Sequence, residues 1–342
     1  MTVPARRKPP VIADVARVAG VSVPTVSRVL TGSTPVSDAK RAQVMAAIET
    51  LGYRPNAAAR ALVSGRQSMI SVLAGNTMRY GYAATLQGVE EAARAAGYLV
   101  VITVVESDDP VVVDAAVSLV LGQAVAGAVV LEFDAAALAA SRALPSSVPV
   151  VTVSSATPGE RTRPHAELDD RSAAGEAVDY LLGLGHRTVH HVAIPSTGPE
   201  VGRTIGWREA LVAAGRPVPE PLAAGWEPSS GYDAGALLAQ DPEVTAVLAG
   251  NDQLAIGLMR AFADAGRAVP GEVSVVGFDD EPFAAMWSPP LTTVAQDFVG
   301  LGRRAFGMLS DLMRTGMSTA RSTAVPELVL RGSAAPPPTP LD

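Results

Sequence analysis

The chain has 342 residues, of which 48% are hydrophobic and 4% aromatic, and its formal net charge is −7. This length is too great for a single compact core and favours two or three domains. The sequence has no cysteine and no apolar run of 18 residues, and its N-terminus lacks the apolar core of a signal peptide. These features exclude disulfides, thiolate metal sites and a transmembrane helix, and they favour a cytoplasmic protein.

Residues 11–30 (VIADVARVAGVSVPTVSRVL) predict two short helices joined by a tight turn. Apolar residues from Ile12 to Ala19 recur on one side of the first helix, and Gly20 can end it in the left-handed conformation. Ser22 is placed to cap the second helix. This spacing fits a helix-turn-helix that reads DNA, but an ordinary helical hairpin packed on a core has the same spacing.

The distribution of charge favours the DNA reader. Residues 1–66 contain ten Lys or Arg against three acidic residues, a net charge of +7, so the rest of the chain carries −14. A basic module on an acidic body is what neutralisation of DNA phosphates requires. A third helix from Asp38 to Leu51 and a short Ala-rich helix at 57–63 complete this domain, which we expect to end at residue 66.

Beyond residue 66, short β-branched runs alternate with helical segments, a pattern typical of parallel α/β sheets with crossover helices. The predicted strands are 69–75, 99–105, 127–133, 148–154, 188–194, 246–250 and 273–279. The predicted helices are 82–97, 110–122, 171–184, 203–215, 229–240 and 252–266. So many strands divide best into two doubly wound lobes with a ligand cleft between them, beyond the carboxyl ends of the strands.

The expected boundaries follow from this pattern. The first lobe takes in about 67–165 and 296–326, and the second takes in about 166–295 and 327–332. The Pro-rich end, 333–342, is expected to be disordered.

Two other classes of protein fit the sequence less well. An enzyme is poorly supported, because the sequence has only four histidines and lacks the HExxH, GxxxxGK[ST] and GxSxG motifs. A periplasmic sugar-binding protein would share the two-lobed body. The basic N-terminal module and the absence of a signal peptide argue against it.

The order of several motifs resembles the LacI/GalR family of bacterial transcriptional regulators over about residues 10–332. The motifs are DVARVAGVSVPTVSRVL, LGYRPNAAARAL, VGRTIGWREAL, VLAGNDQLAIGLMRAF and VSVVGFDDEPFAAMWSPPLTTVAQDF. The resemblance implies an all-α helix-turn-helix headpiece on a two-lobed, periplasmic-binding-protein-like α/β core. It also implies a cytoplasmic, nucleoid-associated homodimer that represses from a palindromic operator and needs no cofactor, metal or membrane. Because no heptad tail follows the core, we expect a dimer rather than a tetramer.

The resemblance places the reading helix at about Val23–Leu30 and assigns it a set of DNA contacts. Arg28 can bind guanine with two hydrogen bonds, whereas Val23 and Pro24 offer only apolar contact or shape. Packing inside the headpiece is the alternative role for Val23. The family match makes Leu62 a wedge in the minor groove, and a position in the hydrophobic core is its alternative role. The residues matched to phosphate contacts are Thr25, Ser27, Thr31, Asn56 and Arg60.

The resemblance also assigns an effector site to the cleft. Arg203 offers a forked donor for sugar hydroxyls, and Trp226 is placed to stack on a sugar ring. The other matched residues are Asn251, Gln253, Asp279 and Phe298, with Asn76, Tyr80, Tyr82 and Ser154 from the first lobe. Helix capping is the alternative role for Asn251 and Asp279, and core packing is the alternative for Trp226. A galactoside-like or other pyranose inducer is expected. Tyr82 keeps a purine or nucleoside effector open, and the sequence does not decide whether the effector induces or acts as a corepressor.

Overall fold

A computed structural model of the protein describes residues 10–31, 34–54, 67–155, 163–196 and 201–338. The chain forms two compact units, 1–68 and 69–342. Within the described part, no helix is both long enough and apolar enough to span a membrane.

The N-terminal unit contains the three predicted helices. They are α1 (Ile12–Ala19), α2 (Val23–Thr31) and α3 (Asp38–Leu51). Gly20 and Gly52 end α1 and α3 with φ angles of 65° and 59°, the left-handed conformation that glycine adopts without a steric penalty. Val15, Val26 and Val44 are fully buried where the three helices meet. These local signals confirm the helix-turn-helix and the helix that follows it.

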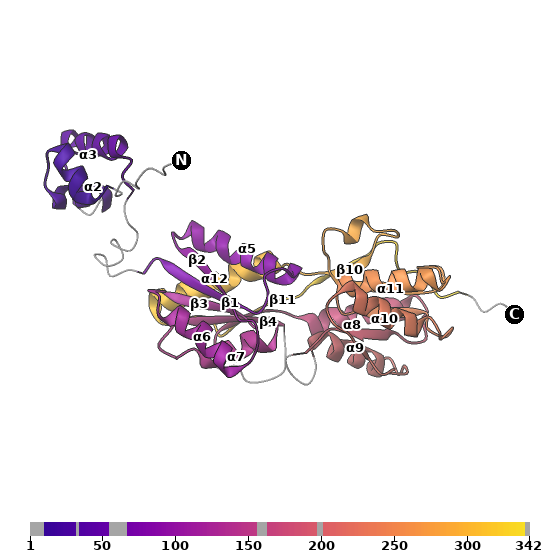
Figure 1. Ribbon diagram of the computed structural model, residues 1–342. Coiled ribbons are helices and arrows are strands. Elements are labelled where there is room, and N and C mark those ends of the chain that lie inside the picture. Colours follow the sequence, from indigo (N-terminus) through magenta and orange to yellow (C-terminus); the bar gives the residue numbers. More distant parts are fainter. Residues whose placement is uncertain (1–9, 32–33, 55–66, 156–162, 197–200, 339–342) are drawn as a thin grey trace, which may run out of the picture. The chain divides into compact units, whose positions relative to one another are not determined.

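The first lobe of the core is built on a six-stranded parallel sheet with the order β11-β5-β4-β3-β1-β2. Its strands are β1 (Met69–Ala74), β2 (Leu99–Val104), β3 (Gly127–Leu131), β4 (Val150–Ser155), β5 (His165–Leu168) and β11 (Arg321–Ala324). Helices α5 (Tyr80–Ala95) and α12 (Phe298–Thr315) cover one face, and α6 (Pro110–Leu121) and α7 (Ala135–Ala143) cover the other (Figure 1). Ile70 and Val72 point to the first face and Leu73 to the second, as the two-residue period of a strand requires.

The second lobe repeats this plan with the strand order β12-β10-β9-β8-β6-β7, in which only β12 runs antiparallel. Its strands are β6 (His190–Ala193), β7 (Leu222–Ala223), β8 (Ala246–Ala249), β9 (Ser274–Asp279), β10 (Thr292–Ala295) and β12 (Glu327–Val329). Its helices are α8 (Asp170–Gly183), α9 (Gly202–Ala213), α10 (Pro228–Leu238), α11 (Asp252–Asp264) and the short 3-10 helix η1 (Ala284–Met286). Helices α8 and α9 pack on one face of the sheet and α10 and α11 on the other. The doubly wound fold class is therefore confirmed.

One of the predicted lobe boundaries needs correction. Strand β5 belongs to the first sheet, so the chain first leaves that lobe after Leu168 rather than near residue 165. It returns between β10 and α12 and leaves again between β11 and β12, which gives three crossings between the lobes.

The expectation of a disordered tail is wrong for residues 333–338. The side chain of Ser333 is fully buried; its hydroxyl donates to the Val275 carbonyl at 2.6 Å and accepts from the Thr292 amide at 2.8 Å. The Ala335 amide donates to the Ser274 hydroxyl at 3.0 Å. These bonds hold the segment against the second sheet in spite of its proline content. Residues 339–342 lie outside the described part.

Candidate functional site

The exposed face of α2 carries the side chains that the sequence assigns to DNA bases. Pro24 and Arg28 are exposed and Val23 is 40% exposed, whereas Val26 and Val29 are buried on the opposite side. Packing inside the headpiece therefore does not account for Val23.

The polar residues of α2 make short-range hydrogen bonds. The hydroxyls of Thr25 and Ser22 lie 2.9 Å apart, and the Thr31 hydroxyl donates to the Ser27 carbonyl at 2.9 Å. Asn56, Arg60, Leu62 and the predicted helix at 57–63 lie outside the described residues, so their assigned roles stay predictions.

A cavity lies between the lobes, at the carboxyl ends of strands from both sheets. The predicted effector residues that line it are Tyr80, Tyr82, Ser154, Arg203, Trp226, Asn251, Gln253, Asp279 and Phe298.

Asn76 is the exception and does not line the cavity. Its side-chain oxygen accepts hydrogen bonds from the backbone amides of Met78 and Arg79 at 2.7 and 2.9 Å. This turn leads into α5, so the structure gives Asn76 a local backbone role in place of the predicted ligand contact.

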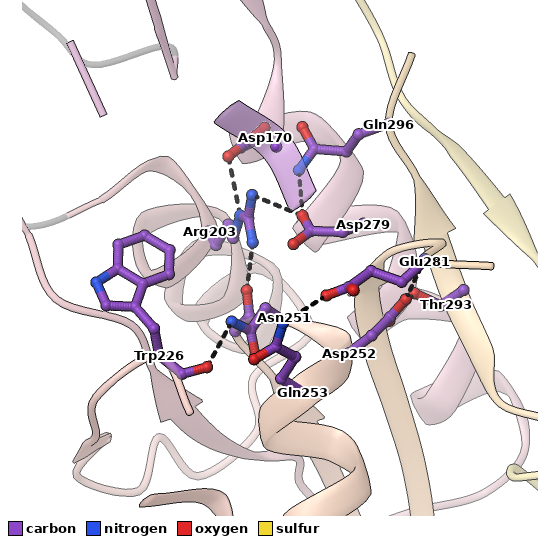
Figure 2. A network of polar contacts seen from close by, with 12 residues as sticks. Asp170, Arg203, Trp226, Asn251, Asp252, Gln253, Asp279, Glu281, Thr293 and Gln296 are labelled. Atoms are coloured by element: carbon purple, nitrogen blue, oxygen red, sulfur yellow. Dashed lines mark hydrogen bonds and ion pairs between the residues drawn. The ribbon is translucent and has the colours of Figure 1, made fainter. Parts of the chain in front are cut away.

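Arg203, at the start of α9, is the centre of a buried ionic network (Figure 2). Its side chain is 8% exposed; Nε donates to Asp170 at 2.9 Å, and a terminal nitrogen lies 3.2 Å from the Asp279 carboxylate. The other terminal nitrogen donates to the Gly250 carbonyl, and the guanidinium lies 4.0 Å from the centre of the Phe278 ring. Arg203 thus holds two carboxylates of the second lobe at the cavity wall.

Burial dominates the ionisation of these carboxylates. It raises the pKa of Asp279 to about 6, although Arg203 and a hydrogen bond from Gln296 act in the opposite direction. Burial likewise raises the pKa of Asp170, against the attraction of Arg203. The guanidinium therefore offsets only part of the cost of burying two acids.

The backbone at the end of β9 adopts an unusual conformation. Asp279 has a φ of 116° and Asp280 a φ of 52°, which cost non-glycine residues roughly 1–3 kcal/mol each. The side chains hold this turn in place, since Gln296 donates to Asp279 at 2.7 Å and Arg331 lies 2.7 Å from the Asp280 carboxylate. Such strain is characteristic of ligand clamps, and here it aims Asp279 at the cavity.

Asn251 and Trp226 connect two further elements at the cavity wall. The Asn251 side-chain oxygen caps α11 by accepting from the Leu254 amide at 2.7 Å, so its capping role is realised. Its amide nitrogen donates to the Trp226 carbonyl at 3.1 Å. The Trp226 ring is half-buried at the cavity, with the Arg79 guanidinium 4.7 Å from its centre.

The first lobe contributes aromatic side chains to the wall of the cavity. Tyr80 packs edge-on against Phe298 with ring centres 5.9 Å apart, and Tyr82 packs edge-on against Phe133 at 5.1 Å. The Tyr82 side chain is buried, and its hydroxyl donates to Asp134. Burial and this hydrogen bond raise the pKa of Tyr82.

Several lining residues were not predicted from the sequence. They are Arg79, Gly81, Glu132, Phe133, Leu168, Asp170, Ile194, Pro195, Val201, Glu281, Gln296 and Leu301. Most of them follow the end of a strand or begin a helix, and this position is the sequence feature that could have identified them. Glu281 stands out because burial and the nearby Asp279 charge raise its pKa to about 7.

Comparisons with known proteins agree with both units of the chain. Residues 11–56 match the model of bacterial regulatory proteins of the lacI family, and residues 178–334 match a periplasmic binding protein-like domain. The chain is 31% identical over 312 residues to catabolite control protein A of Priestia megaterium, covering 88% of this chain and 92% of that protein.

Solved structures match nearly the whole chain. The lac repressor dimer bound to operator and the anti-inducer ONPF matches with a TM-score of 0.87 and 28% identity, covering 96% of this chain and all (100%) of that one. A complex of the transcriptional regulator CelR with cellobiose matches with a TM-score of 0.71 and 29% identity, covering 95% and 100%. The class is thus a transcriptional regulator that joins a DNA-binding helix-turn-helix to a periplasmic-binding-protein-like domain. The chain belongs to the lacI family of bacterial regulatory proteins.

Proposed function

We propose that the protein is a repressor that binds a near-palindromic operator as a homodimer and is released by a pyranose, galactoside-like or related, bound in the cleft. The observation that supports a sugar ligand is the Arg203 network beside aromatic rings. A forked guanidinium and a carboxylate can bind neighbouring hydroxyls of a sugar, while aromatic rings cover its apolar face. Arg203, Asp279, Trp226 and Phe298 line one cavity and supply both kinds of contact.

The DNA half of the proposal depends on α2 and on the basic character of residues 1–66. Arg28 is the one exposed side chain among the assigned base readers that can donate hydrogen bonds. Val23 and Pro24 can recognise only thymine methyl groups or groove shape. We therefore expect a strong preference for guanine at one position of each half-site, and weaker preferences beside it.

The proposed homodimer is supported by apolar side chains exposed at one edge of the first sheet. Strand β2 is one of the two edge strands of this sheet, and it exposes Leu99, Ile102 and Val104. On α6, which packs beside β2, Val111 and Leu119 are also exposed. An apolar edge strand next to an apolar helix face is a hazard for a lone chain, and a symmetric partner would cover it.

Release of the operator follows from thermodynamic linkage between ligand binding and DNA binding. The cavity is lined by both lobes, so a ligand that contacts both favours one angle between them. If that angle disfavours the operator-bound dimer, operator affinity falls by the ratio of ligand affinities for the two states. A purine effector receives less support, because the buried Tyr82 ring is not open for stacking on a base.

Selection of double-stranded DNA from a random pool by the full-length chain tests this function. The expected result is a near-palindrome with a guanine in each half-site. Arg28→Ala should remove the guanine preference, whereas the matched control Arg41→Ala, at an exposed site on α3, should keep it. Enrichment of no sequence, or an unchanged preference in Arg28→Ala, would contradict the proposal.

A further inference from the structure

The cavity carries more carboxylates than cations. Its acidic lining residues are Glu132, Asp170, Asp279 and Glu281, and its basic ones are Arg79 and Arg203. Arg203 is shared between Asp170 at 2.9 Å and Asp279 at 3.2 Å. Arg79 lies over the Trp226 ring, 4.7 Å from its centre. The positive charge of Arg203 is therefore already balanced by two carboxylates, while its remaining N–H groups can still donate to a ligand.

Glu281 is a cavity carboxylate that forms no ion pair with a described residue. It is 8% exposed, and its Oε1 accepts one hydrogen bond from Gln253 at 3.2 Å (Figure 2). Across the described part of the chain, no Lys, Arg or His nitrogen lies within 4.0 Å of this carboxylate. The backbone amide of Glu281 donates to Asp252 at 2.7 Å, which fixes the residue at the cavity wall. Burial first, and then the charge of Asp279, raises the pKa of Glu281 to about 7, as expected for an acid that lacks a counter-charge.

Two other buried polar atoms at the same cavity also point to a ligand. Asp170 Oδ1 and Ser154 Oγ are buried and find no hydrogen-bond partner among the described residues. Buried polar atoms normally have a hydrogen-bond partner, and a ligand with several hydroxyl groups would supply one to each of them. They lie on β4 and at the start of α8, away from Glu281 in sequence, and are an independent sign that the cavity is built for a polar molecule.

We propose that the cleft selects an amino sugar, a hexose that carries an ammonium group, with the ammonium on Glu281 and the hydroxyls on Arg203 and Asp279. The inference rests on the proposed function and narrows its class of ligand. A neutral hexose leaves the buried charge of Glu281 uncompensated or requires the carboxyl to stay protonated. An ammonium group removes that cost and adds a charge-assisted hydrogen bond, about twice as strong as a neutral one.

Isothermal titration calorimetry of the full-length protein at pH 7 tests the inference. The probes are D-glucosamine and D-galactosamine, each compared with its parent hexose and its N-acetyl derivative. At least one hexosamine should bind about tenfold or more tightly than its parent hexose and its N-acetyl form. Glu281→Gln, which keeps the size of the side chain, should reduce this preference to less than about threefold.

A matched control removes a negative charge from elsewhere in the same lobe. Glu220→Gln, at an exposed position, should keep the full preference for the hexosamine. Tryptophan fluorescence melting shows whether each variant is folded. Equal or tighter binding of the parent hexoses, or a preference that survives Glu281→Gln, overturns the amino-sugar inference and leaves the pyranose ligand in place. Binding of no sugar in either series overturns both.

Discussion

Replacing Arg203 with methionine should destabilise the core strongly, in a way that depends on pH. Methionine keeps much of the length of the side chain but removes the charge that Asp170 and Asp279 share. Removing one partner of a buried ion pair costs about 3–5 kcal/mol of unfolding free energy, because the remaining charge stays buried. We expect a loss of this size at pH 8, where both carboxyl groups would have to ionise.

The sign of the pH dependence follows from the carboxyl groups. Even beside Arg203, burial raises the pKa of Asp279 to about 6, above its unfolded value of 3.8. Without Arg203 the folded pKa rises further. An acid with a raised folded pKa costs stability when it ionises, and it recovers that stability as pH falls toward the unfolded pKa. The deficit of Arg203→Met should therefore shrink at pH 5.

Urea denaturation followed by tryptophan fluorescence measures this effect in the full-length chain. All three tryptophans, Trp207, Trp226 and Trp287, lie in the core unit, so the signal does not report unfolding of the headpiece. Adding Asp170→Asn and Asp279→Asn to Arg203→Met should recover much of the loss, because no uncompensated charge remains. A deficit below about 1 kcal/mol at pH 8, or an equal deficit at pH 5 and pH 8, would refute this account of the network.

Three further predictions concern the headpiece and the pH response of the wild-type core. Gly20→Ala should cost the headpiece about 1–2 kcal/mol, measured by amide hydrogen exchange, because φ is 65° and the added Cβ meets no atom within 4 Å. Gly183→Ala, where φ is not positive and the space is equally open, should cost nothing; a larger loss there would argue against the conformational explanation. Arg28→Ala should lose about 1–3 kcal/mol of discrimination at one base pair of each half-site in competition binding; a uniform loss on all sequences would make Arg28 a phosphate contact. The carboxyl groups of Asp279 and Glu281 should stabilise the core more at pH 5 than at pH 8, because their folded pKa values (about 6 and about 7) lie above the unfolded values of 3.8 and 4.5; the lowered pKa values of His186 and His190 act in the opposite direction. In urea denaturation at the two pH values, Glu281→Gln should therefore lose stability at pH 5 relative to pH 8 when compared with the wild type, and an unchanged pH dependence would show that Glu281 does not contribute to it.

The fold was predictable wherever local sequence determines structure. Gly20 and Gly52 mark the ends of two headpiece helices, and β-branched runs mark the buried strands. Strands β5 (HAEL) and β11 (RSTA) carry no such pattern. They form because each pairs with a strand brought beside it by the rest of the lobe. That pairing is a tertiary effect, so the position of the lobe boundary did not follow from the sequence.

The site was predictable through strand ends and family motifs, but not in its electrostatics. Asp279 is the last residue of a recognisable strand, whereas Glu281 reaches the cavity after the chain turns through positive φ angles at Asp279 and Asp280. Asn76 also follows a strand, yet its side chain bonds to the backbone of the next turn. Proximity to a strand end therefore identifies candidates, and the backbone conformation after the strand decides which of them face the cavity.

Reciprocal coupling between operator and sugar tests the central claim most directly. The affinity of the full-length dimer for its selected operator is measured with and without a saturating amount of the tightest-binding sugar of the hexose and hexosamine series. The affinity for that sugar is then measured with and without operator. The account predicts that each ligand weakens the other by the same factor, between about 5-fold and 150-fold. Unchanged operator affinity at saturating sugar would contradict it.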